Sequence, residues 1–241
     1  MSDLLIRKFE RYGPLSDEEK QVLQQITAKV VIYGPREEIV PEGSSPSDSK
    51  LILEGFATRH NHSCDGRRQI TAFHIPGDFA DLHSFLLKKM DDGVGALTTC
   101  TVAAVPHNDL KEITKKYPYL TRVLWFTTLV DAAIHRAWMT TLGRMDSRER
   151  IAHFLCELHD RLEVVKLTKN RSYDLPITQE ELGDALGMST VHVNRVLQDL
   201  RADGLITSRG KSVTINDWER LQREAQYNPD YLYGDHKLER D

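Results

Sequence analysis

Residues 177–206, ITQEELGDALGMSTVHVNRVLQDLRADGLI, carry the signals of two helices joined by a tight turn. Thr178, with a glutamate three residues later, has the spacing of a capping box, which predicts the start of the first helix. Gly187 can adopt the left-handed conformation that ends this helix, and Ser189 is a preferred first cap for the next. Gly183 is small, where two helices would cross closely. The combination predicts a helix-turn-helix.

The second helix of such a motif is expected to present its N-terminal residues while its apolar side packs inward. Arg195 could form paired hydrogen bonds with guanine, Asn194 could do so with adenine, and Val191 could pack on a thymine methyl group. Helix N-termini favour phosphate, and the segment LITSRGKSVTI suggests two strands that form a wing on the DNA backbone. The candidate DNA-binding residues are Thr178, Gln179, Ser189, Thr190, Val191, His192, Asn194, Arg195, Arg209 and Lys211.

The first half of the chain has a different pattern. Residues 1–30 suggest short helices, with a capping box at Ser16 and Glu19. From residue 30 to 105, short β-rich runs alternate with turn residues. Asp65–Gly66, for example, is a favoured two-residue hairpin turn. This spacing predicts a small antiparallel roll or barrel.

A long helix is predicted over residues 117–145, where no proline follows Pro118. Eight of its positions recur in steps of four and three, which is the spacing of a coiled-coil seam. We therefore expect the helix to pair with a second copy, the alternative being a helix that lies across the roll. Asp131 is a polar residue on this seam. The predicted dimerisation residues are Leu120, Leu124, Thr127, Asp131, Ile134, Trp138, Thr141 and Met145.

Length and composition set only broad limits. A chain of 241 residues suggests one large domain or two smaller ones. The formal net charge of −4 gives no indication of nucleic acid, although only a docking face matters for such binding. No apolar run of about 18 residues suggests a membrane span, and the polar N-terminus is unlike a signal peptide. The few, widely separated cysteines fit a reducing compartment, so a cytoplasmic protein is expected.

The order of roll, long helix, helix-turn-helix and wing resembles the Crp/Fnr family of bacterial transcription regulators over nearly the whole chain. IPGDFADLHSFLL and LTTCTVAAV resemble its sensory roll, and MDSRERIAHFL and the stretch quoted first resemble its DNA-binding domain. The resemblance implies an α+β fold. It would comprise a roll similar to cyclic-nucleotide-binding domains in residues 1–116, a dimerisation helix in 117–145 and a winged helix-turn-helix in 146–241.

The same resemblance implies a regulator that binds double-stranded DNA as a homodimer, at a two-fold symmetric operator with half-sites about one helical turn apart. Arg195 matches the arginine with which the family recognises guanine. RNA polymerase is an expected partner, and the sequence leaves open whether the basic loop Lys166–Arg171 contacts it. The roll segment IPGDFADLHSFLL also resembles FixK-like members of the family. These members suggest that the roll can serve as a fixed scaffold with no effector. Otherwise, it would sense an unidentified signal.

Three departures from the family are visible. Val191 stands where familiar members have glutamate, so their half-site preference does not carry over. Cyclic-nucleotide binders have Gly-Glu and Arg-Ser pairs where this chain has Asp81–Leu82 and, approximately, Gly95–Ala96. The glutamate that binds the ribose is therefore missing unless Asp81 substitutes for it, and a nucleotide phosphate would lack its cation. The clustered N-terminal cysteines of iron–sulfur members are missing, because the cysteines here are Cys64, Cys100 and Cys156. No cofactor is therefore predicted.

A rival interpretation is a metal-dependent enzyme of cupin type. His60, His62 and Cys64 alternate, so on a strand they would share one face and could bind a metal or contribute to a haem site. The downstream glutamate expected of a cupin is missing, and a cupin does not explain the helix-turn-helix. The simpler interpretation of RHNHSCDGRRQ is a polar hairpin. We therefore expect that the protein is not an enzyme.

Overall fold

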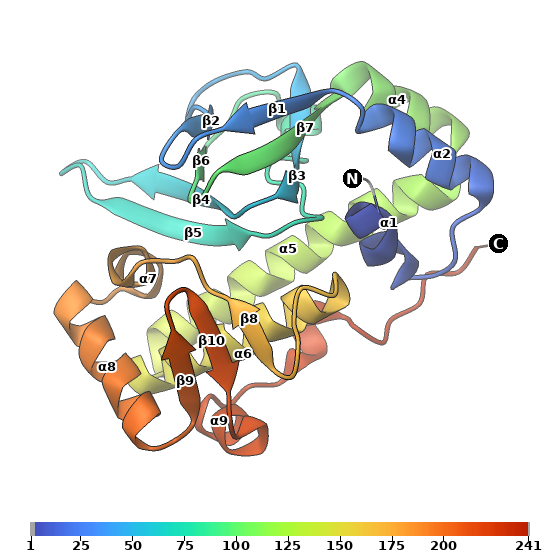
Figure 1. The fold of residues 1–241 in the computed structure, drawn as a ribbon. Coiled ribbons are helices and arrows are strands. Elements are labelled where there is room, and N and C mark those ends of the chain that lie inside the picture. Colours follow the sequence, from blue (N-terminus) through green and yellow to red (C-terminus); the bar gives the residue numbers. More distant parts are fainter. Residues whose placement is uncertain (1–2, 241) are drawn as a thin grey trace. The chain divides into compact units, whose positions relative to one another are not determined.

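The computed structural model describes residues 3–240 and contains two compact units. One unit holds the chain up to Ala132 and the segment from Gly234 onward, and the other is Ala133–Tyr233. One continuous helix, α5 (Pro118–Arg144), passes from the first unit into the second (Figure 1). No helix within residues 3–240 is long and apolar enough to cross a membrane. These compact units differ from the predicted segments 1–116, 117–145 and 146–241, and that division of the chain stays a prediction.

The first unit surrounds a β-roll with helices, as the sequence suggested. Its helices are α1 (Asp3–Glu10), α2 (Asp17–Ile26), α3 (Ser84–Leu87), α4 (His107–Lys116) and the beginning of α5 (Pro118–Arg144). Its strands are β1 (Val30–Tyr33), β2 (Glu38–Val40), β3 (Asp48–Glu54), β4 (Ala57–His62), β5 (Arg68–His74), β6 (Gly93–Ala96) and β7 (Cys100–Pro106).

Two antiparallel sheets, ordered β1-β7-β3 and β2-β6-β4-β5, form the roll. The β4–β5 hairpin differs from its predicted form. Ser63 N–H donates to Arg67 O at 2.9 Å, and Gly66 has a φ of +79°. The connection is therefore a three-residue loop, 64–66, because its last residue takes the left-handed conformation that such loops require.

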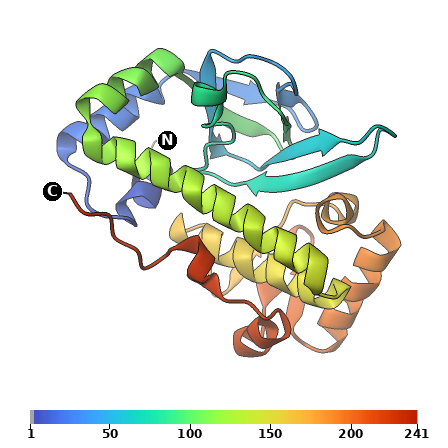
Figure 2. The same ribbon diagram turned by 180° about the vertical axis from the view of Figure 1, so that it is seen from behind.

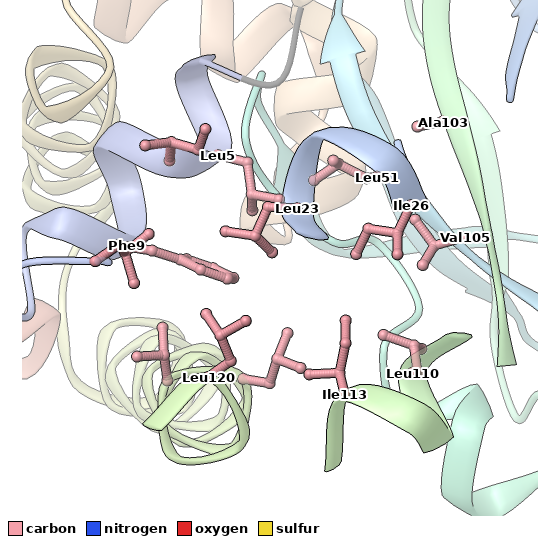
Figure 3. Packing of buried hydrophobic residues seen from close by; sticks show 14 of the residues in the cluster. Leu5, Phe9, Leu23, Ile26, Leu51, Ala103, Val105, Leu110, Ile113 and Leu120 are labelled. Carbon is pink, nitrogen blue, oxygen red and sulfur yellow. The ribbon is translucent and has the colours of Figure 1, made fainter. Parts of the chain in front are cut away.

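The core of the first unit lies where its helices meet the roll (Figure 3). Leu5 and Phe9 come from α1, Leu23 from α2, Ile113 from α4 and Leu120 from α5, and each is almost completely buried. Burying a side chain of this size stabilises the fold by roughly 1.5–3 kcal/mol. The contacts hold the N-terminal helices and the start of α5 on the roll.

The second unit is built on α6 (Ser147–Val164), which begins at the capping box of Asp146 and Glu149. The other elements are β8 (Ser172–Asp174), α7 (Gln179–Leu186), α8 (Thr190–Ala202), β9 (Ile206–Arg209), β10 (Ser212–Ile215), α9 (Trp218–Glu224) and the 3-10 helix η1 (Pro229–Leu232). The three strands form an antiparallel sheet with the order β8-β10-β9. The roll, long helix and winged helix-turn-helix of the predicted α+β fold are all present.

Most of the seam predicted on α5 for a partner helix packs inside the protein. Leu120 and Leu124 belong to the core of the first unit. Trp138 is buried in the second unit, where its indole N–H donates to Glu157 on α6 at 2.9 Å. A heptad spacing identifies an apolar stripe but not what covers it. Leu120, Leu124, Ile134, Trp138 and Thr141 are buried, whereas Thr127, Asp131 and Met145 are half-buried.

The last segment of the chain packs in the first unit, which no sequence pattern suggested. Leu238 N–H donates to Tyr12 O at 2.8 Å. The Arg240 guanidinium donates to Glu19 at 2.7 Å and lies 4.4 Å from the ring centre of Tyr119. Figure 2 shows this segment, in red, beside the blue N-terminal helices. The segment from Gly234 onward is thus held in the first unit by contacts with α2 and with the loop after α1.

Candidate nucleic-acid interface

The helix-turn-helix consists of α7, a turn of three residues and α8. The predicted capping box is present, since Thr178 Oγ1 accepts from Glu181 N–H at 3.2 Å and the Glu181 carboxylate accepts from Thr178 N–H at 2.7 Å. Gly187 has a φ of +67° and ends α7. Ser189 Oγ then accepts from His192 N–H at 3.3 Å, which caps α8. Local sequence signals therefore set both ends of the turn.

Gly183 closes the turn through a contact other than the one predicted. A Cβ atom on Gly183 would lie 2.4 Å from the carbonyl oxygen of Met188, closer than real Cβ atoms approach. The Gly183 carbonyl also accepts from the N–H groups of Gly187 and Met188, the latter at 3.0 Å. This is the hydrogen-bond pattern of a glycine-ended helix. Glycine is needed for the approach of the turn's own backbone, not for the crossing of two helices.

The buried side of α8 holds the helix against the rest of the second unit. Val193 and Leu200 are fully buried, and Val196 and Leu197 are nearly so. Arg150 on α6 donates to the carbonyl oxygen of Leu186, the last residue of α7, at 2.9 Å. This contact satisfies a carbonyl that a helix C-terminus leaves open. No local sequence signal indicates this contact, because the two residues lie far apart in the chain.

The exposed side of α8 carries part of the predicted DNA-binding set. Ser189, Thr190, Val191 and Arg195 are all exposed, and Val191 is 81% exposed despite its apolar side chain. Gln198 is exposed as well. Gln198 was not among the predicted residues, although its position three residues after Arg195 places it on the same helix face.

Two predicted residues of α8 are instead bonded within the protein. His192 is half-buried, and its Nε2 lies 2.8 Å from Ser147 Oγ at the start of α6. Asn194 is half-buried too, and its Nδ2 donates to Gln179 Oε1 at 2.9 Å. Gln179 is the first residue of α7, so this bond joins the two helices of the motif. The structure thus separates residues that the sequence grouped together.

The wing has the predicted strand-turn-strand form. Strands β9 and β10 pair around Gly210, whose φ is +58°. Arg209 and Lys211 flank this glycine, and both are exposed. Thr178 is exposed at the N-terminus of α7, where backbone N–H groups favour an anion. The second unit therefore presents cations and hydroxyl groups at α7, α8 and the wing.

The roll uses Asp81 for its own structure. Asp81 is fully buried, and its carboxylate accepts from Lys50 N–H at 2.5 Å and from Ser84 Oγ at 3.3 Å. Burial raises the pKa of this carboxyl group above its ordinary value. The carboxylate is thus turned toward β3 and α3, not available as a substitute for a ribose-binding glutamate. Gly95 lies against the ring of His60, a Cβ there being 3.3 Å from Cε1.

The histidines of the hairpin do not assemble a metal site with Cys64. The His60 and His62 rings pack edge to face with 5.2 Å between their centroids, but Cys64 lies in the exposed loop. Within residues 3–240, the group of side chains close enough to share a metal ion is His83, Asp91 and Asp92. The cupin-like alternative therefore gains no support from the roll.

The comparisons with known proteins match this arrangement. Residues 149–224 match the Crp-like helix-turn-helix domain family, and residues 30–117 match the cyclic nucleotide-binding domain family. The transcriptional activator protein FnrL of Cereibacter sphaeroides is 30% identical, over 80% of this chain and 79% of its own. The transcriptional activatory protein AadR of Rhodopseudomonas palustris is 31% identical, over 88% and 86%. The structure of FixK2 from Bradyrhizobium japonicum superposes with a TM-score of 0.73 at 26% identity, over 81% of this chain and 96% of that one.

Proposed function

Because the chain belongs to the Crp/Fnr family of transcription regulators, we propose that it binds a two-fold symmetric DNA operator as a homodimer. The observation that carries the proposal is the exposed N-terminal half of α8. This half presents Val191 and Arg195, and two caps and a left-handed glycine fix the turn that precedes it. A helix held in this way fits the major groove, where arginine can recognise guanine.

The proposed dimer uses a different stripe of α5 from the one predicted. Trp125, Leu129 and Met139 are 67%, 51% and 72% exposed. Together with Ala132 and Gly143 they follow steps of four and three, interrupted by Arg136, so they lie along one side of the helix. Large exposed apolar side chains in a row are typical of an interaction surface. We assign this face to a second copy of the chain.

Transcriptional activation is the proposed outcome of binding, since the names of FnrL and AadR describe activators. The loop Lys166–Arg171 is largely exposed and basic, which suits a contact with RNA polymerase in the cytoplasm. No cyclic nucleotide is assigned to the roll. The Asp81 carboxylate is hydrogen-bonded to the backbone of Lys50 within the roll, and the Gly95–Ala96 pair offers no cation for a phosphate.

Selection of binding sites from random duplex DNA tests this function. The purified protein, without added ligand, is expected to enrich a two-fold site with half-sites about ten base pairs apart. Affinity for that site should fall steeply with salt, because many of the contacts would be to phosphates. Failure to enrich any sequence would count against the proposal.

Two variants separate base recognition from phosphate contact. Arg195→Ala should lose discrimination at a guanine by about 5- to 150-fold, the range that corresponds to one paired hydrogen-bond contact. Lys211→Ala should weaken binding to all sequences alike and reduce the salt dependence. Equal binding of Arg195→Ala and the parent to the selected site would reject the role of Arg195.

A further inference from the structure

We propose, resting on the DNA-binding function above, that α8 recognises bases through Val191 and Arg195, whereas His192 and Asn194 position the helix without contacting bases. Val191 contacts the 5-methyl group of a thymine, and Arg195 contacts the edge of a guanine. The four residues share the N-terminal part of one helix. What divides them is where each side chain is directed and what it already contacts.

Val191 is suited to an apolar contact and to nothing else. Its side chain is 81% exposed, beside the exposed Thr190. An aliphatic side chain cannot form hydrogen bonds, so the feature of a base edge that it matches in the major groove is the thymine methyl group. Contact between the two removes both from water, which is favourable. An exposed valine at this point of a projecting helix therefore selects for thymine.

His192 is directed toward α6. Its ring nitrogen Nε2 lies within hydrogen-bond distance of Ser147 Oγ, at 2.8 Å, and the side chain is half-buried. Ser147 is the first residue of α6, directly after the Asp146 cap. A ring held in this way fixes the start of α8 on α6. His192 therefore acts on DNA through the placement of α8.

Asn194 is held across the motif by the first residue of α7. The Nδ2–H···Oε1 bond to Gln179 is 2.9 Å long, and Asn194 is half-buried. Recognition of adenine by asparagine requires the amide to present both a donor and an acceptor to one base edge. Here the orientation of the amide is set by Gln179. The pair therefore joins the start of α7 to α8.

A thymine-to-uracil exchange tests the role of Val191. Each thymine of one selected half-site is replaced in turn by deoxyuridine, which lacks the 5-methyl group and still pairs with adenine. The parent should lose about fourfold in affinity at one position, the factor that corresponds to burying one methyl-sized group. Val191→Ala should bind the two operators equally there. If the parent binds thymine and uracil operators equally at every position, the role is rejected.

Double-mutant cycles test the positioning pairs. His192→Ala, Ser147→Ala and their combination form one cycle, and Asn194→Ala, Gln179→Ala and their combination form the other. Each single variant should weaken binding to all sequences alike and keep the parent's base preferences, and each double variant should be no weaker than its singles. Ser147→Thr, which keeps the hydroxyl group, should restore parental affinity.

The outcomes are separable from those of the proposed function. A parent protein that selects no operator rejects DNA recognition itself. A selected operator whose base preference changes at any position with His192→Ala or Asn194→Ala rejects the positioning roles alone. Thermal unfolding of each variant establishes that it is folded at the assay temperature, so a loss of affinity does not stand for a loss of fold.

Discussion

Arg59 on β4 and Asp131 on α5 form an ion pair of 3.0 Å between Nη1 and Oδ2. The Arg59 side chain is 7% exposed, and it also donates to the carbonyl oxygen of Ala80 at 3.0 Å and lies 3.3 Å from Asp92. These contacts link the roll to α5. They also explain the polar residue on the stripe predicted for dimerisation, because Asp131 neutralises a cation of its own chain.

Arg59→Met is expected to lower the free energy of unfolding by about 3–5 kcal/mol, because it leaves carboxylates beside a buried site without their cation. Urea denaturation measures the change. Arg67→Met is the control on the same hairpin, since Arg67 is 85% exposed and its pair with Asp65 should contribute at most about 1 kcal/mol. Equal losses in the two variants would contradict the role of Arg59.

Gly183→Ala is expected to destabilise the helix-turn-helix by about 1–3 kcal/mol, because the new Cβ meets the Met188 carbonyl and the turn must shift. Operator affinity should fall with it. Gly34→Ala is the control, because a Cβ there makes an ordinary contact of 3.6 Å. Thermal unfolding and operator titration check both, and a Gly183→Ala variant with parental values would refute the packing argument.

Met139→Glu on the exposed stripe of α5 should convert the proposed dimer to a monomer, because a dimer would bury the new charges without partners. Ile32→Glu is the matched control, since Ile32 is 68% exposed on β1 and lies outside that stripe. Sedimentation at several concentrations gives the mass of each. A dimeric Met139→Glu, or a parent that is monomeric throughout, would exclude this face.

The buried His153 on α6 should make the stability of the fold sensitive to acid. His153 is buried, and its ring is stacked on that of Tyr231 with 5.9 Å between the ring centroids. Burial lowers the pKa of His153 below its ordinary value of 6.5. The unfolded chain therefore takes up this proton more readily, so stability is lost as the pH falls below that ordinary value. His153→Phe should reduce the loss by at most about 1.4 kcal/mol per pH unit. Urea denaturation on either side of the ordinary pKa measures it, and parallel losses in variant and parent would contradict the prediction.

The elements were predictable to different degrees. The capping boxes at Ser16 and Thr178 are present as predicted, since each involves residues three apart whose bonds form within one turn of helix. The β4–β5 turn was predicted one residue too short, because Asp-Gly favours more than one hairpin loop. The DNA contacts of Thr178, Ser189, Thr190, Arg209 and Lys211 stay predictions.

The sequence alone determined where helices begin and end and which segment forms the helix-turn-helix, because caps, a left-handed glycine and apolar spacing act over a few residues. Only the tertiary structure decided what those helices contact. On α5, the side of the helix that carries Trp138 is buried, whereas the side that carries Met139 is exposed. On α8, His192 contacts Ser147 and Asn194 contacts Gln179. Partners distant in sequence come together only when packing fixes the helices, so local spacing does not specify them.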